Sequence, residues 1–170
     1  MPHIMKNCII RFCAVLLTAI SIISCNSKSV HTPGVRVSNL VQRTTVEGVC
    51  DTIFITDSVN IGDTLRLGMI VDAYFDYLKS VIAKSDEDKA LVSLSWNEEQ
   101  MDVIASDADL EHGKLVFVPM KVPACVTILQ YIPLTAGTQS IHINVTSTAV
   151  EPYSYSSWYF NVAVREKKEP

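Results

Sequence analysis

The sequence predicts an all-β protein, an antiparallel β-sandwich of seven to eight strands. After residue 24 it contains 19 Val, 10 Ile and 11 Thr against 10 Leu and 9 Ala, and β-branched side chains suit pleated, half-buried surfaces. Several windows alternate apolar and polar residues with a period of two, as strands with one buried face do. Turn signals rich in glycine, proline and aspartate separate these windows.

The first half of the predicted domain begins with a short strand over residues 52–56, followed by a strand in which alternate residues of 65–75 are apolar. The window 74–83 also fits the spacing of a helix. Because a single strand running from residue 64 through this window would be unusually long, we expect two consecutive strands that separate near Asp72. A short helix is the alternative.

The second half supplies shorter strands with one apolar face each. They are expected at 90–96, 101–105, 115–118, 125–132, 140–146 and 158–164. Trp158 has the same parity as Phe160, Val162 and Val164, which predicts that its ring lies in the core rather than on the surface.

The N-terminus predicts export. Of the first 24 residues, 16 are hydrophobic. Lys6 and Arg11 precede the apolar run, and the first acidic residue is Glu47. The apolar stretch 12–23 is too short for a membrane-spanning helix, which needs about 20 residues. Residues 1–24 therefore have the pattern of a secretory signal peptide.

The end of this segment resembles the lipobox of bacterial lipoproteins. Ile22, Ser24 and Cys25 occupy the aliphatic, small and cysteine positions of that motif. The resemblance implies cleavage before Cys25, a thioether-linked diacylglycerol and an amide-linked acyl chain such as palmitate, and two or more chains hold a protein stably to a bilayer. The alternative is an ordinary signal peptide cut elsewhere, with Cys25 a free thiol.

The polar segment after the cysteine predicts a tether. Residues 26–45 contain Pro33-Gly34 and no sustained period, so we expect residues 25–45 to be a lipidated, flexible linker, 46–166 the folded domain and 167–170 a disordered tail. Asn26 does not match the aspartate that retains some lipoproteins in the inner membrane, and no acidic run follows Cys25. The lipoprotein resemblance thus implies a Bacteroidales-type protein of the outer membrane facing the periplasm, with surface exposure as the alternative.

The predicted domain also resembles immunoglobulin-like and fibronectin-like modules of bacterial secreted proteins. A glycine turn at Gly137 precedes an alternating strand, and an aromatic-led strand closes the chain. Trp96 would lie on a middle strand, where such modules place a core tryptophan. The resemblance covers about residues 46–166 and implies a fold without functional residues, because sandwich folds support unrelated functions.

Two cysteines remain after the signal peptide and Cys25 are set aside. They are Cys50 and Cys125, an even pair in an exported protein, which predicts a disulfide. Two buried thiols are the alternative.

Three tripeptides resemble the Asp-Ser/Thr-aliphatic acceptor for O-linked sugars in Bacteroidales-type periplasmic proteins. The acceptor residues would be Thr52, Ser58 and Thr64. Ordinary strand and turn chemistry is the alternative interpretation.

Catalytic and cofactor motifs are scarce, so we expect neither an enzyme nor a resident cofactor or metal. There is no nucleophile elbow, Gly-rich phosphate loop or histidine pair at metal spacing. The carboxylate clusters at 98–102 and 107–111, the latter followed by His112, are interpreted as solvated loops. With 14 Lys+Arg against 18 Asp+Glu, no basic face suits nucleic acid.

Two function classes remain. The first is a lipid-anchored, non-catalytic interaction or structural module that binds a protein of the cell envelope. The second is a ligand-binding lipoprotein accessory to an uptake system. Glycans are the expected ligands, because sugar sites use exposed aromatic rings. The candidate ligand aromatics are Tyr153, Tyr155 and Tyr159.

Overall fold

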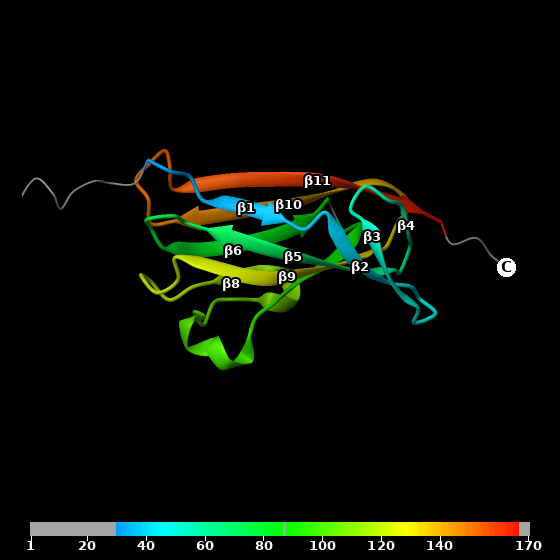
Figure 1. Cartoon of the computed structure of the whole chain (residues 1–170), viewed down its shortest axis with the longest axis horizontal. Coiled ribbons are helices and arrows are strands. Elements are labelled where there is room, and N and C mark those ends of the chain that lie inside the picture. The colour runs from blue at the N-terminus through cyan, green and yellow to red at the C-terminus, as the bar shows by residue number, and fades with distance from the viewer. Residues whose placement is uncertain (1–29, 87, 167–170) are drawn as a thin grey trace, which may run out of the picture.

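The computed structural model describes residues 30–86 and 88–166 (Figure 1). The expected signal peptide 1–24, Cys25 and the expected tail 167–170 lie outside the described residues. Within the described part, the chain forms eleven strands and two short 3-10 helices. Neither helix has the length or the hydrophobicity to cross a bilayer.

One sheet has six strands, in the order β3-β2-β5-β9-β7, with β1 also paired to β5. Its strands are β1 (Gly34–Val37), β2 (Leu40–Thr44), β3 (Cys50–Phe54), β5 (Thr64–Asp72), β7 (Ala90–Ser95) and β9 (Ala124–Pro133). All pairs in it are antiparallel. β1 and β2 lie end to end along the same side of β5, since Val35 pairs with Val71 and Arg43 with Leu65.

The other sheet has five strands, in the order β4-β11-β10-β6-β8. Its strands are β4 (Val59–Asn60), β6 (Leu78–Ser85), β8 (Lys114–Val116), β10 (Gly137–Ser147) and β11 (Tyr155–Arg165). The pairs are antiparallel except β4 with β11, which is parallel and involves only Val164 and Arg165 of β11. A register shift interrupts the pairing of β10 with β6 between Thr146 and Ser147.

The inner faces of the two sheets share one apolar core. Alternate residues of β5 and β9 point inward, and Leu67 and Leu129 are fully buried there. From the opposite sheet, Val81, Ile141 and Ile143 meet them and are equally buried. This period-two burial is what the alternation in the sequence predicts. The all-β, mostly antiparallel class is therefore confirmed, although the number of strands is eleven rather than seven or eight.

The ambiguous window 74–83 contains no helix. β5 ends at Asp72 and β6 begins at Leu78, which confirms two consecutive strands. In contrast, the strand expected over 101–105 is wrong: Glu98–Val103 forms the 3-10 helix η1. The Asn97 side chain accepts a hydrogen bond from the Glu99 amide at 3.1 Å, so a local polar cap stabilises the turn.

The tether prediction is wrong for the segment that contains β1 and β2. Both strands pair with β5, and Val35 and Val41 are buried in the core. Their short lengths, four and five residues, explain why no sustained period marks them. The folded region therefore begins by Gly34 and not at residue 46.

Both tryptophans also lie elsewhere than predicted. Trp158 has the inward parity, yet it is 47% exposed because it lies in the part of β11 that β4 does not cover. Trp96 follows β7, which is an edge strand and not a middle one. Its half-buried ring packs edge-on against Phe117, with 5.5 Å between ring centroids.

Candidate functional site

The outer side of the five-stranded sheet, which we call the polar face, is dominated by hydrogen-bonding and aromatic groups. Register and alternation place on it Ser80, Ile82, Lys84, Ser140, His142, Asn144, Thr146, Tyr155, Ser157, Tyr159 and Asn161. Across β6, β10 and β11, Lys84, His142 and Tyr159 form one row. Such a surface can recognise a polar, hydroxyl-rich ligand through side-chain hydrogen bonds and stacking.

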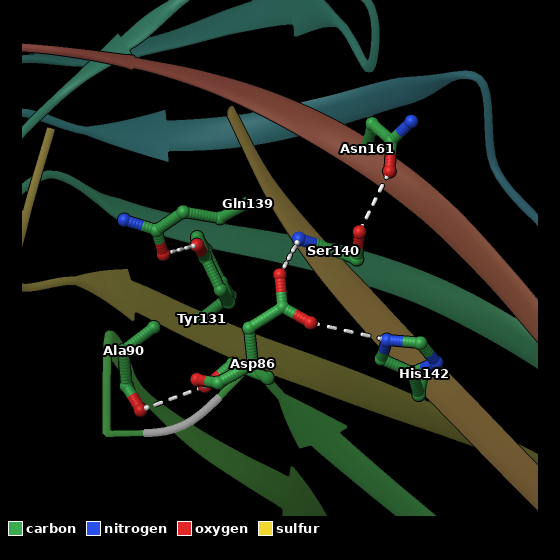
Figure 2. Close-up of polar contacts among 8 residues, drawn as sticks. Asp86, Ala90, Tyr131, Gln139, Ser140, His142 and Asn161 are labelled. Atoms are coloured by element: carbon green, nitrogen blue, oxygen red, sulfur yellow. Dashed lines mark hydrogen bonds and ion pairs between the residues drawn. The ribbon is translucent and has the colours of Figure 1, made fainter. Parts of the chain in front are cut away.

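Asp86 joins this face to the connection between the two sheets (Figure 2). Its carboxylate accepts a hydrogen bond from the Ser140 amide at 2.8 Å and lies 3.3 Å from Nε2 of His142. The Ser85 hydroxyl donates to the Ala90 carbonyl at 3.3 Å, which closes the turn between β6 and β7. A shallow depression of about 520 Å³ beside this network is lined by Lys84, Ser85, Asp86, Lys89, His142 and Asn144.

Serine, histidine and aspartate meet here, but not in the order of a catalytic relay. In such a relay the histidine lies between the nucleophilic hydroxyl and the carboxylate. Here the Ser140 hydroxyl donates to Asn161 at 2.8 Å, as Figure 2 shows, while Asp86 binds the Ser140 backbone. The arrangement positions His142 and fastens the β6–β7 connection, and it does not activate Ser140.

Acidification should weaken this network. The Ser140 amide, with a smaller contribution from His142, holds the pKa of Asp86 below its usual value of 3.8. Because the folded-state pKa is the lower one, the charged carboxylate stabilises the folded state above pH 3.8, and this contribution is lost as the pH falls through the folded-state value. We expect Asp86→Asn to lower the urea midpoint at pH 7, and the difference from wild type to shrink below about pH 4. An unchanged difference at low pH would contradict a charge-based role.

The structure brings together two of the three predicted ligand tyrosines. Tyr155 and Tyr159 both lie on the polar face. The Tyr155 hydroxyl donates to Asn144 at 2.7 Å, and Tyr159, 71% exposed, has its ring centroid 6.3 Å from that of His142. Tyr153 is half-buried in the loop before β11 and does not join them.

The outer side of the six-stranded sheet carries a group of exposed apolar residues, which we call the outer apolar face. Polar residues lie beside it, with Arg36 paired to Ile70 and Ser95 to Ile128. The outer apolar face consists of five exposed residues: Leu40, Phe54, Ile70, Val126 and Ile128. They lie close together, since Leu40 pairs with Phe54, Ile70 with Val126, and Ile128 with Gly68. A Cβ placed on Gly68 would have no neighbour within 4 Å, so the centre of this face is open.

The predicted disulfide is absent from the structure, in which Cys50 and Cys125 are both free thiols. Cys50 is exposed on β3, and Cys125 is buried near the start of β9, in pairing with Val71. The two lie toward opposite ends of the sheet, because β3 and β2 pair near the Thr64 end of β5. Burial raises the pKa of the Cys125 thiol to about 12, so this thiol is unreactive.

The three sugar-acceptor tripeptides lie around β3, β4 and the start of β5. Thr52 is exposed on the outer side of β3, whereas Ser58 and Thr64 are half-buried. The three aspartates have structural partners. Asp51 pairs with Arg43 across the strands, Asp57 accepts from the Phe54 amide, and Asp63 accepts from the Asn60 amide. Turn and strand chemistry therefore accounts for each aspartate, and Thr52 is the most accessible of the three hydroxyls.

The carboxylate clusters do not converge. Asp109 contacts His112 at 2.9 Å, and Asp107 lies 3.4 Å from the Lys114 ammonium. Among the described residues, no group of three or more His, Cys, Asp or Glu side chains is arranged to hold a metal ion.

Asp86, His142 and the outer apolar face were not identified from the sequence. The outer apolar face does leave a signal in the sequence. Val126 and Ile128 of β9 alternate with the buried residues of that strand and therefore point to the outer side of the sheet. A half-exposed strand normally carries polar residues there. The pairing of Asp86 with His142 depends on two residues 56 positions apart, which no local pattern contains.

Comparisons with known proteins give little further guidance. No protein-family model matches the sequence, and no curated protein matches it. One similar solved structure is a family 123 glycoside hydrolase from Clostridium perfringens, studied for glycolipid glycan hydrolysis. It is 14% identical, with a TM-score of 0.35 over 77% of this chain. The match spans 27% of that structure, and so low a score carries no inference about the fold or the activity of this chain.

Proposed function

We propose that this chain is a Bacteroidales-type outer-membrane lipoprotein, anchored through Cys25 and facing the periplasm, whose β domain is a non-catalytic interaction or structural module. The outer apolar face is the observation that carries this proposal. An exposed group of five large apolar side chains on one sheet face is typical of surfaces that bind another protein.

The domain fits an immunoglobulin-like or fibronectin-like module that has gained strands. Two antiparallel sheets around one core, a glycine turn at Gly137 before β10 and an aromatic-led closing strand support this assignment. β1 and β2 lie outside the region that carries the resemblance.

An uncovered strand edge adds a second contact surface. β4 covers only Val164 and Arg165 of β11, so residues 155–163 have no partner strand on that side within the described chain. Sequence positions 153–164 contain neither a charge nor a proline, the devices by which proteins usually protect an edge. An extended segment of a partner could pair here by strand addition.

The proposal is tested on the full chain, expressed with a C-terminal affinity tag and isolated from membranes after mild cross-linking. We expect a clickable fatty acid to label the wild type but not Cys25→Ser. Ile128→Lys should retain the label, and the amount of cross-linked partner recovered with it should fall at least tenfold. Tyr159→Lys, a matched change on the polar face, should retain the partner. Equal recovery with Ile128→Lys would exclude the outer apolar face, and label on Cys25→Ser would exclude the anchor.

Glycan binding at the polar face is the second candidate, and it rests on the exposed ring of Tyr159 beside His142, Asn144 and Tyr155. A sugar stacked on Tyr159 would lie near the imidazole of His142 in the same row and the side-chain amide of Asn144 in the next row. In the same experiment, a glycan array probed with the purified protein separates the two functions. Binding that Tyr159→Lys abolishes and Ile128→Lys preserves would favour this second candidate.

A further inference from the structure

The end of the molecule at which the described chain begins gathers three connecting loops (Figure 1). The β5–β6 turn and the β8–β9 loop are joined there by hydrogen bonds from Leu78 to Val122 at 2.7 Å and from Ala73 to Pro123 at 2.8 Å. The loop after β10 joins them through the Thr148 amide, which donates to the Tyr77 carbonyl at 2.9 Å. We call this end the N-terminal pole.

Large apolar side chains project from the tips of this pole. Phe75 is 84% exposed and Met120 is 60% exposed, and both Tyr74 and Val30 are more than half exposed. Tyr74 and Met120 each have a φ of 58°, in the left-handed region that bulky residues rarely adopt. Strained backbone of this kind is concentrated at functional positions. Each of the two loops therefore has a costly backbone conformation at or beside an exposed apolar side chain, namely Met120 itself and Phe75 next to Tyr74. The Tyr74 ring lies over Gly34, since a Cβ on Gly34 would be 3.0 Å from the Tyr74 hydroxyl.

The start of the chain contacts the same tips. The ring of His31 lies 5.5 Å from that of Tyr74 and 6.0 Å from that of Phe75, measured between centroids. Cys25 precedes Val30 by five residues, which can span at most about 18 Å when extended. A lipid on Cys25 thus confines this pole, and not the opposite one, to the neighbourhood of the bilayer.

We propose that the N-terminal pole docks on the lipid bilayer and inserts Phe75 and Met120 into its interfacial layer. This inference rests on the proposed lipid anchor. Aromatic rings favour the headgroup region, and apolar side chains add affinity in proportion to the area they bury there. The nearby carboxylates of Asp72 and Asp76 are held in place by hydrogen bonds from the Tyr74 amide and the Thr148 hydroxyl. Lys121, exposed beside Met120, suits lipid phosphates.

The test places a polarity-sensitive fluorophore at each pole of the full lipidated chain in phosphatidylcholine vesicles. In a Cys50→Ser background, Phe75→Cys labels the N-terminal pole and Val49→Cys labels the opposite one. Val49 is an exposed apolar residue in the β2–β3 turn, and buried Cys125 should not compete for label. On reconstitution, we expect the emission at position 75 to shift to the blue and to be quenched by brominated lipid, with no change at position 49.

A second pair of variants separates docking from folding. Met120→Asp should abolish the shift at position 75, whereas Leu134→Asp, at an exposed apolar residue of the opposite pole, should preserve it. Urea midpoints equal to the wild type verify that both variants fold. If the protein floats with the vesicles but the emission of the probes at 75 and 49 responds alike, the docking proposal is overturned and the anchor proposal stands. Protein that does not float with vesicles would overturn both.

Discussion

Replacing Gly113 with alanine is expected to destabilise the domain by about 2–5 kcal/mol. Gly113 follows the 3-10 helix η2 (Leu110–His112) and has a φ of 70°, which costs an L-residue about 1–2 kcal/mol. A Cβ there would lie 2.3 Å from the carbonyl oxygen of Ala83, a backbone atom of β6 that cannot turn aside. Forcing the two apart adds about 1–3 kcal/mol. Urea denaturation of the full chain measures the loss.

Gly48 provides the matched control for this prediction. It also has a positive φ, 83°, but nothing lies within 4 Å of a Cβ built on it. Gly48→Ala should therefore lose only the conformational part, about 1–2 kcal/mol. Equal losses for the two variants would show that the contact with Ala83 makes no contribution.

Truncating Leu67 should destabilise the domain by about 2–5 kcal/mol, whereas truncating Ile70 on the same strand should have little effect. Leu67 is fully buried between the sheets, so Leu67→Ala loses the transfer energy of its side chain and leaves a cavity. Ile70 points to the opposite side of β5 and is 43% exposed. Ile70→Ala should change the free energy of unfolding by less than about 1 kcal/mol.

This comparison tests whether the outer apolar face is exposed to solvent when the protein is in solution. If Ile70→Ala lost as much stability as Leu67→Ala, something in solution would cover that face, such as a second copy of the chain. A dependence of the loss on protein concentration would identify that case.

The sequence was informative about strands that alternate over eight or more residues. In β5, β9 and β10 each side chain's direction follows from its neighbours, because one core constrains the whole strand. It was uninformative about β1 and β2, whose four and five residues offer too few repeats and gain their order from pairing with β5. The prediction for Trp158 was wrong for a different reason: parity gives the direction of a side chain, but only the sheet order shows that β11 has a neighbouring strand on one side alone at this position.

The candidate surfaces were predictable to a smaller degree. Tyr159 could be proposed as a ligand residue because it lies off the apolar face of the last strand, and Tyr155 because it was expected to precede that strand. His142 and Asp86 could not, since their contact depends on where the β6–β7 connection crosses between the sheets. The predicted disulfide between Cys50 and Cys125 was wrong, because an even number of cysteines does not show that two of them lie close together in the fold.

The placement of β1 and β2 has a practical consequence for producing the domain. A fragment starting at residue 46, the boundary suggested by composition, would lack two strands and leave one whole side of β5 unpaired from Thr64 to Asp72. Exposed backbone of that length next to apolar side chains promotes aggregation. A fragment for crystallisation or binding studies should therefore begin ahead of β1, which starts at Gly34.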